Sequence, residues 1–328
     1  MDDGTIDVAW LSRKLSKAVE SVTVREQSKM GGMSCDFQFL DVKFFSEEDP
    51  VAMVAKSAPA GKATAVSMGL AREALFYKEL APCLSDLARL PKCFYAAGDM
   101  ATGQMLLLLE CCDDAVPTGL FFGPGNPNNW SQKGQLVEIA EGNPSGEEVA
   151  AGAFRLYARM HAAFWEDREL LFSKPWLRAS DWLRGEGRAW WQGAQGFAQG
   201  KWREILACVE AAGESAFAAE DPALVNGVRW DRHLVACLKS SFGRACSEGG
   251  WERYLAEAAA RPVTLVHGDA HPHNHLWAKQ GTPEAFSVLI DFEMVGCGSP
   301  AQDLGQYAIS HLSPAARRAV VFRDTRLH

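Results

Sequence analysis

The stretches VTLVHGDAHPHNHL (263–276) and SVLIDFE (287–293) decide the fold of this chain. In each stretch a short apolar run ends on polar side chains: Asp269 and Asn274 follow the first run, and Asp291 follows the second. Short apolar runs bounded by polar residues are typical of strands. The sequence therefore predicts two short strands, each of which delivers carboxylate or amide side chains from its end.

These side chains are of the types that phosphoryl transfer from a nucleotide requires. One carboxylate orients an acceptor hydroxyl and accepts its proton, while an amide oxygen and a second carboxylate hold Mg²⁺ against the phosphates. The segment from His267 to Asn274 reproduces the protein-kinase spacing H-x-D-x-x-x-x-N. Asp291-Phe292 reproduces the D-F that follows, with Glu293 where glycine is usual. The pattern favours a kinase-type site.

A lysine and a glutamate nearer the N-terminus complement this set. Lys56 ends the apolar run AMVAK, as the lysine of the kinase V-A-I-K strand does. Glu73 lies 17 positions later in a segment with helical spacing, where it can pair with the lysine. Gly31 and Gly32, in a turn close to Ser34, form either a plain hairpin turn or one whose backbone approaches phosphates.

The first 110 residues read as an antiparallel sheet of about five strands that carries one helix. Apolar spacing predicts helices and alternation predicts strands, separated by Gly- and Pro-containing turns. Residues 5–22 have helical spacing, as do residues 68–80, and the expected strands are 21–27, 35–45, 51–56, 94–97 and 105–109.

The rest of the chain reads as a larger, mainly helical part. Residues 113–146 are rich in Gly, Pro and Asn and are expected to form a loop. Helix formers dominate from there to about residue 260, with clear helices at 147–165 and 202–212, and another is expected at 314–322. We predict an α+β fold with an N-terminal lobe, residues 1–110, and a C-terminal lobe, residues 111–328.

Composition narrows the class of protein. The chain has 328 residues and a formal charge of −8, which argues against a nucleic-acid partner because phosphate backbones attract basic surfaces. No apolar run approaches the ~18 residues that span a bilayer, and the N-terminus lacks the order of a signal peptide. Nine cysteines without a C-x-x-C pair are expected to be reduced, mostly buried thiols of a cytoplasmic protein.

The chain resembles the aminoglycoside phosphotransferase and choline kinase-like superfamily, and most of all its ecdysteroid kinase-like (CHK kinase-like) branch. The phrases HGDAHPHN, IDFE, SPAQDLGQY, REALFYKEL and ARMHAAFW carry the resemblance, which extends from about Thr5 to about His311. It implies a two-lobed protein-kinase-like fold and transfer of the γ-phosphate of ATP to a hydroxyl of a small molecule, with ATP and Mg²⁺ as cofactors. The alternative is a catalytically inactive ATP-binding protein, which would ordinarily have lost one of the site residues.

The resemblance implies a role for each matching residue. Asp269 is the catalytic base or the residue that orients the hydroxyl, and Asn274 and Asp291 are the magnesium ligands. Lys56, held by Glu73, binds the phosphates.

Further residues are expected to support this site. The resemblance implies that the backbone of Glu110 to Cys112 binds adenine and that Asp303 braces the catalytic loop by hydrogen bonding. It leaves open whether Glu293 binds a second magnesium. His267 is expected to hydrogen-bond to backbone.

Several other readings of the sequence remain. The four histidines of 267–275 could form a zinc site, although no cysteine or carboxylate pair has zinc-finger spacing. Otherwise His273 and His275 face solvent or pack, and His271 faces the substrate. The tryptophans between residues 165 and 202 form a core or a cage for a quaternary ammonium, and Phe164 and Trp165 are expected in the core.

The acceptor is also left open. Asp303 follows Asp291 by only twelve positions, too few for a protein-kinase activation segment, so a small acceptor is favoured. Asp113 and Asp114 are either solvated or able to attract a cationic acceptor. Choline-like amines, sugars, aminoglycosides, hydroxylated steroids and hydroxy acids all remain possible, and the sequence does not indicate an oligomeric state.

Overall fold

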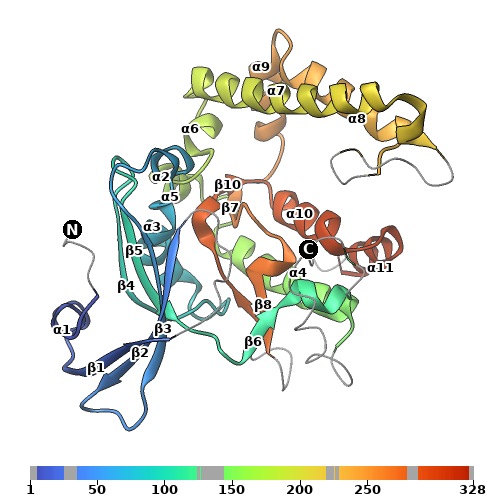
Figure 1. Ribbon diagram of the computed structural model, residues 1–328. Coiled ribbons are helices and arrows are strands. Elements are labelled where there is room, and N and C mark those ends of the chain that lie inside the picture. The colour runs from blue at the N-terminus through green and yellow to red at the C-terminus, as the bar shows by residue number, and fades with distance from the viewer. Residues whose placement is uncertain are drawn as a thin grey trace. The chain divides into compact units, whose positions relative to one another are not determined.

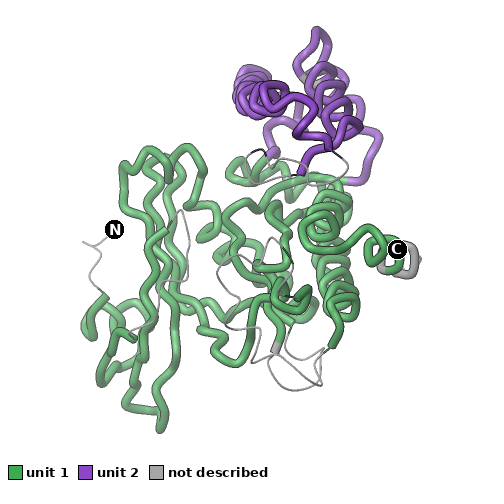
Figure 2. The backbone as a smooth tube through the Cα atoms, turned by 45° about the vertical axis from the view of Figure 1, so that its right-hand side comes forward, with its two compact units in different colours: residues 1–178, 263–328 green, residues 179–262 purple. Residues whose placement is uncertain are grey.

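The computed structural model describes residues 6–25, 35–123, 126, 144–218, 225, 229–278 and 287–324. The chain forms two compact units, one made of residues 1–178 and 263–328 and the other of residues 179–262 (Figure 2). All the described residues of the expected site lie in the first unit. The division into lobes at residue 110 stays a prediction.

A five-stranded antiparallel sheet forms the N-terminal part of the first unit (Figure 1). Its core contains Leu40, Val42, Met53 and Leu108, and in the strand of Leu40 and Val42 these buried residues alternate with more exposed ones. The strand order is β1-β2-β3-β5-β4, with β1 Val19–Val24, β2 Asp36–Phe44, β3 Val51–Ala58, β4 Cys93–Gly98 and β5 Met105–Glu110. The predicted antiparallel sheet of about five strands is confirmed.

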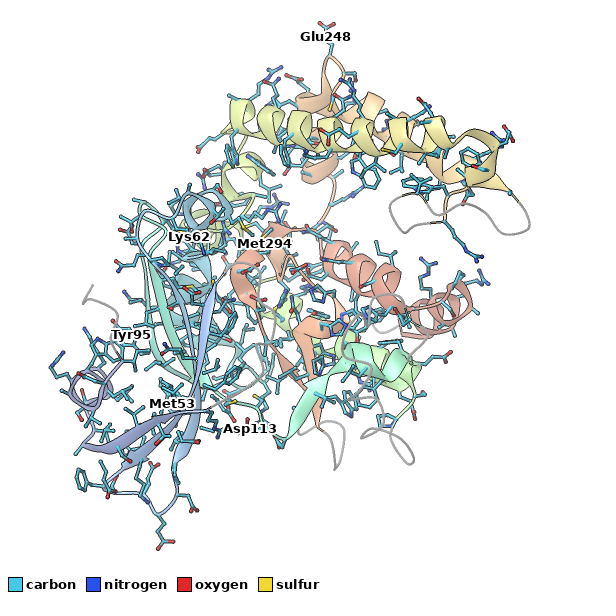
Figure 3. The ribbon with its side chains drawn as sticks, in the orientation of Figure 1. Met53, Lys62, Tyr95, Asp113, Glu248 and Met294 are labelled. Atoms are coloured by element: carbon cyan, nitrogen blue, oxygen red, sulfur yellow. The ribbon has the colours of Figure 1, made fainter. Side chains whose placement is uncertain are left out.

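Helix α1, Val8–Leu15, covers one end of this sheet and is shorter than predicted. Asp7 caps its N-terminus by accepting from the N–H of Trp10 at 2.7 Å, and the Trp10 ring meets that of Tyr95 edge-on at 5.2 Å (Figure 3). The helix predicted over 5–22 is wrong beyond Leu15, because Ser16 adopts a left-handed conformation (φ 51°) and strand β1 follows.

The helix predicted over 68–80 is confirmed as α3, which starts later than expected, and a further short helix precedes it. Helix α2, Ala63–Met68, ends at Gly69, whose positive φ of 69° breaks the helix, and α3, Arg72–Glu79, then begins. Helix α3 packs on β4 and carries Glu73 and Phe76 on its buried face. Because the helix breaks at Gly69, α3 is a separate short helix that carries Glu73 toward Lys56.

The remainder of the first unit combines helices with two small sheets. Strands β6, β8 and β9 form one antiparallel sheet, and β7 and β10 form the other. Their bounds are β6 Ala115–Pro117, β7 Thr264–Val266, β8 His275–Ala278, β9 Val288–Leu289 and β10 Gly296–Gly298. The 113–146 loop prediction is wrong at its start, where β6 and the 3₁₀ helix η2, Thr118–Phe122, lie.

Helix α4 is the longest helix of this unit and begins at a capping box formed by Ser145 and Glu148. The α-helices here are α4 Gly146–Ala163, α5 Arg168–Phe172, α10 Ala301–His311 and α11 Pro314–Asp324, and the remaining 3₁₀ helices are η1 Ala81–Leu84, η6 Pro272–Asn274 and η8 Phe292–Met294. An antiparallel sheet followed by a mainly helical part confirms the predicted α+β fold.

The second unit is mainly helical in its described residues. It contains α6 Ser180–Leu183, α7 Arg188–Ala212, η5 Gly213–Phe217, α8 Arg232–Ala245 and α9 Gly250–Ala259. Helix α7 begins fourteen residues before the predicted start at 202. Trp191 packs against Trp251 and Tyr254, with ring centroids 5.5 Å apart in each case. This arrangement is typical of aromatic core packing.

Two burial predictions are wrong. Phe164 is buried as expected, but Trp165 is 52% exposed, because α4 ends at Ala163 and helical spacing no longer decides where the next side chains point. The nine cysteines are free thiols, yet only Cys35 and Cys297 are buried and four of the others are exposed. Among the described helices, none is long and apolar enough to cross a bilayer.

Candidate active site

The loop between β7 and η6 carries Asp269 and is shaped by Gly268. Gly268 has a φ of 81°, and a Cβ at this position would overlap the backbone carbonyl of Met294. Met294, labelled in Figure 3, ends the short helix that follows Asp291. Glycine thus allows the Asp269 loop to pack directly against the Asp291 segment.

Asp303 on α10 fixes the backbone at the start of this loop. Its side chain is fully buried, and its oxygens accept from the N–H groups of His267 at 2.8 Å and Gly268 at 3.0 Å. The Nε2–H of His161 on α4 donates to the same carboxylate at 2.9 Å. Hydrogen bonds to a charged acceptor are stronger than neutral ones. Asp303 therefore ties α4, α10 and the loop together.

His267 is a buried neutral imidazole. Its Nε2–H donates to the carbonyl of Ile290 at 2.8 Å, and its Nδ1 accepts from the N–H of Asp269 at 3.3 Å. This fixes the tautomer, because a carbonyl can only accept and an amide N–H can only donate. Burial also lowers the pKa of His267 below its usual value. His267 thereby links the backbone on which Asp269 and Asp291 sit.

Asn274 is hydrogen-bonded to Asp269, and its backbone pairs with Ile290, the residue before Asp291. Its Nδ2 donates to the backbone carbonyl of Asp269 at 3.0 Å and to the side-chain Oδ2 at 3.2 Å. The backbone carbonyl of Asn274 accepts from the N–H of Ile290 at 3.0 Å, next to the pairing of β8 with β9. The strand pairing therefore brings Asn274 next to Asp291, and the side-chain donor is turned toward Asp269.

Lys56 on β3 faces three carboxylates. Its Nζ lies 2.6 Å from Glu73, 2.6 Å from Asp291 and 3.7 Å from Glu293. The lysine side chain is 5% exposed and that of Glu73 is 1% exposed, whereas Asp291 is 33% exposed. The predicted partners Lys56 and Glu73 are thus in direct contact, and the same lysine reaches Asp291.

The charges of this cluster do not cancel. Burial by itself would lower the pKa of Lys56, but Glu73 and Asp291 outweigh it and hold the pKa above its usual value. Lys56 is therefore a cation at neutral pH. Burial raises the pKa of Glu73 to about 7, so the negative charge that exceeds that of the ammonium comes from Asp291 and Glu293.

Glu73 also holds the segment that follows Asp291. Its Oε1 accepts from the backbone N–H of Phe292 at 3.1 Å, and the Phe292 ring stacks on that of Phe76 with centroids 4.0 Å apart. Asp291 itself has a φ of 64°, a left-handed conformation that non-glycine residues rarely adopt. Backbone strain of this kind persists where surrounding contacts impose it, and it often marks functional positions.

Asp269 has hydrogen-bond donors on both carboxylate oxygens. Nε2 of Gln306 donates to Oδ1 at 2.7 Å, and Nε2 of His271 lies 3.5 Å from Oδ2. Burial would raise the pKa of Asp269, but His271 and Gln306 outweigh it and lower the pKa below its usual value. Asp269 is therefore ionised at neutral pH. Sequence reasoning missed Gln306, although it lies within the SPAQDLGQY phrase.

The segment Glu110–Cys112, where adenine was expected to bind, follows β5. The N–H of Cys111 donates to the carbonyl of Ala52 at 3.1 Å, and the carbonyl of Cys112 accepts from Ala115 at 3.1 Å. Among the described residues, the N–H of Cys112 has no hydrogen-bond partner. One backbone donor of this segment therefore remains for a ligand.

Asp113 and Asp114 follow directly on this segment. Asp113 lies where the chain leaves the sheet (Figure 3) and forms an ion pair with Arg25 at 2.7 Å. Both aspartates are exposed. The structure thus gives Asp113 a partner on β1's side of the sheet rather than leaving it wholly solvated.

Some predicted site residues fall elsewhere. Gly31, Gly32 and Ser34 lie outside the described residues. Of the two alternatives for His275, solvent exposure or packing, the structure shows packing, because the side chain is completely buried. Burial lowers the pKa of His275 to about 3. In the part of the chain that the structure describes, no three His, Cys, Asp or Glu side chains form a group that could hold a metal ion, which leaves the zinc reading without support.

The side chains at Asn274 and Asp291 fit a magnesium ion that also binds nucleotide phosphates. Mg²⁺ prefers oxygen ligands and usually takes one or two from protein, with phosphates and water completing the set. The donor of Asn274 is directed at Asp269, so its Oδ1 is the atom left to bind a cation. The net negative charge around Lys56 favours a cation as well.

A lysine on an antiparallel sheet is paired with a glutamate on a helix and contacts an aspartate that follows a short strand. A second aspartate and an asparagine lie on the loop after another strand. This arrangement defines a kinase-like phosphotransferase. The chain belongs to the phosphotransferase enzyme family, whose profile matches residues 41–325. The class and the superfamily expected from the sequence are thereby confirmed. No curated protein matches the chain significantly.

Solved structures resemble the chain at low identity. An aminoglycoside phosphotransferase in complex with GDP and kanamycin is 13% identical, with a TM-score of 0.43 over 96% of this chain and 81% of that chain. The choline kinase LicA from Streptococcus pneumoniae is 13% identical, with a TM-score of 0.42 over 95% and 78%. A thermostable mutant of another aminoglycoside phosphotransferase is 10% identical, with a TM-score of 0.46 over 98% and 83%.

Proposed function

We propose that this protein transfers the γ-phosphate of ATP to a hydroxyl group of a small molecule. The observation that carries the proposal is the contact of Lys56 with both Glu73 and Asp291 at 2.6 Å, beside the hydrogen-bonded pair of Asp269 and Asn274. Kinase-type phosphoryl transfer uses these residue types in this arrangement. Membership of the phosphotransferase enzyme family supports the same reaction.

Each residue has a role in the proposed reaction. Asp269, ionised at neutral pH, orients the acceptor hydroxyl and takes its proton as the oxygen bonds to the γ-phosphorus and ADP leaves. Lys56, positioned by Glu73, binds the nucleotide phosphates. Asn274 and Asp291 hold Mg²⁺, which when bound neutralises phosphate charge. His267 and Asp303 keep the loop in shape.

The nucleotide would be held at its other end by backbone. The free N–H of Cys112, in the segment Glu110–Cys112, can donate to a ring nitrogen of adenine. Gly31, Gly32 and Ser34 belong to the proposed phosphate-facing turn. These assignments make ATP the expected donor.

The acceptor is proposed to be small, and the protein to act in the cytoplasm. The eleven residues between Asp291 and Asp303 give no room for the activation segment with which protein kinases bind peptides. The chain resembles most of all the ecdysteroid kinase-like branch, so hydroxylated steroids belong among the first acceptors to test. Choline-like amines, sugars, aminoglycosides and hydroxy acids complete the set.

The test is an ADP-release assay with Mg²⁺-ATP across a library of small alcohols. At least one alcohol should stimulate ADP release by the wild-type protein, and Asp269→Ala should abolish this release while still binding ATP. Equal release by the wild type and the variant would refute the proposal. Release of AMP or pyrophosphate in place of ADP would show a different chemistry.

A further inference from the structure

We propose that Gln306 is a positioning residue that orients the Asp269 carboxylate toward the acceptor hydroxyl. This inference rests on the function proposed above. Gln306 lies on α10, and its Nε2–H donates to Asp269 Oδ1 at 2.7 Å while its Oε1 accepts from the N–H of Ala270 at 3.1 Å. One side chain therefore binds the reactive carboxylate and the backbone beside it.

The backbone fixes which way round the Gln306 amide sits. The N–H of Ala270 can only donate, so the amide oxygen must face Ala270. The amide nitrogen is then directed at Asp269, where a carboxylate can only accept. Both ends of the amide are satisfied in this orientation alone. Gln306 is thus a defined donor to Asp269.

This hydrogen bond restricts rotation of the Asp269 carboxylate. Gln306 holds Oδ1, and the Nδ2 of Asn274 lies 3.2 Å from Oδ2. Turning the carboxylate would break both contacts, so its free lone pairs keep one direction. Reaction rates depend steeply on such orientation, and misplacement of a reacting group by about 1 Å can cost about a hundredfold in rate.

Helix α10 holds the whole reactive loop through two residues one turn apart. Asp303 accepts from the N–H groups of His267 and Gly268, and Gln306 binds Asp269 and the N–H of Ala270. Positions i and i+3 lie on one face of a helix. Within the loop, Asp303 binds only backbone, whereas Gln306 also contacts the side chain proposed to touch the substrate.

The variant Gln306→Glu separates the two contacts of this side chain. Glutamate has the same shape and keeps an oxygen for the N–H of Ala270, but it places a second carboxylate oxygen against Asp269 where a donor was. Gln306→Leu removes both contacts. Gln302→Glu is the matched control, because Gln302 lies one turn earlier on α10, is exposed, and makes no hydrogen bond to Asp269.

The readout is ADP release at pH 8 and at pH 9, because a carboxylate placed beside Asp269 raises the pKa of the pair and the higher pH favours ionisation of both groups. Gln306→Glu should lower kcat by about tenfold to a hundredfold while the KM for ATP changes by less than about twofold. Gln302→Glu should match the wild type in both constants. An unchanged kcat in Gln306→Glu would overturn the proposal, since Gln306 would then only support the backbone.

The two proposals fail in different ways. If the wild type and Asp269→Ala release ADP equally, the phosphotransferase assignment fails; if the wild type is active and Gln306→Glu is equally active, only the positioning role fails. Hydrogen exchange of the Ala270 amide can be measured without any phosphate-accepting substrate. The amide should exchange at the wild-type rate in Gln306→Glu and faster in Gln306→Leu, and equal exchange in all three proteins would contradict the geometry on which the inference rests.

Discussion

Lys56 occupies a position that a lysine can hold only because of its partners. Its side chain is 5% exposed, and transferring an unpaired ammonium to such a site costs several kcal/mol. Glu73 and Asp291, each 2.6 Å from Nζ, offset that cost and keep the lysine charged. The two carboxylates come from segments more than two hundred residues apart, so the lysine joins the sheet to the Asp291 segment.

Gly268→Ala should prevent the active loop from forming. The φ of 81° disfavours any side chain, and the added Cβ would overlap the carbonyl of Met294, which cannot retreat as a flexible side chain could. We expect loss of turnover and a free energy of unfolding lower by about 2 kcal/mol or more, measured by urea denaturation.

Gly200→Ala is the control for that substitution. Gly200 lies within α7, and a Cβ there meets no other atom within 4 Å. Alanine is the better helix former, so this variant should be more stable than the wild type by about 0.5–1 kcal/mol. A Gly268→Ala protein as stable and active as Gly200→Ala would show that the loop does not require glycine.

At the residue scale, the sequence revealed the reactive side chains but not all of their partners. Asp269, Asn274 and Asp291 were predicted because their mutual spacing is local and tied to two strands. Gln306 was missed because it lies 37 positions from Asp269 and reaches it only when α10 packs beside the loop. Such a contact depends on tertiary packing, which spacing along the chain does not encode.

At the element scale, strands were predicted better than helix ends. The alternation in β2 and the apolar runs of β3 and β5 placed these strands to within one or two residues, because burial on one or both faces repeats along the strand. Helix ends depend on single residues with positive φ, such as Ser16 and Gly69, which the apolar spacing does not mark. Trp165 is exposed because α4 ends two residues earlier, at Ala163, and its C-cap Phe164 has a φ of −124°.

Asp303→Asn should impair α10's support of the loop. The amide keeps one oxygen acceptor but turns an N–H₂ donor toward backbone N–H groups or His161, all of which are donors in the wild type. We expect a loss of about 1–3 kcal/mol in the free energy of unfolding, together with reduced kcat.

The matched control for Asp303→Asn is Asp231→Asn. Asp231 caps the N-terminus of α8, where asparagine serves about as well as aspartate. Its stability and kcat should stay near wild type. If both variants behave alike, the buried hydrogen bonds of Asp303 contribute little beyond an ordinary surface carboxylate.

At the scale of the whole molecule, the chain divides into two compact units, one of residues 1–178 and 263–328 and the other of residues 179–262. Residues 179–262 have a core of their own, built from Leu206, Val209, Ala216, Val225 and Trp230. The sequence showed a helical region there but no boundary, because helix formers continue from α4 through α9 without a change in composition. The compositional change near Glu110 instead marks the end of the sheet.

Acid should destabilise the folded protein through His311. Burial lowers the pKa of His311 to about 4, with His273 and His271 adding to the effect. The unfolded chain therefore binds this proton at higher pH than the folded chain does, so the associated stability is complete above about pH 6.5 and is lost as the pH falls toward 4. The melting temperature should decline between pH 7.5 and pH 5, as calorimetry would show.

Variants assign that decline to the buried imidazole. His311→Phe should show a smaller drop in melting temperature between pH 7.5 and pH 5 than the wild type, whatever its stability at pH 7.5. His233→Gln, at an exposed position on α8, should leave the drop unchanged. Equal drops in His311→Phe and the wild type would mean that other groups carry the acid sensitivity.

The bonds from Asp303 to the loop have a consequence for synthesis of the chain. A product that terminated after Met294 would already possess the lysine, both glutamates and every reactive aspartate, yet the amides of His267 and Gly268 would lack their acceptor. A frameshift or early stop between Met294 and α10 should therefore yield an inactive polypeptide, even though it contains all the reactive side chains.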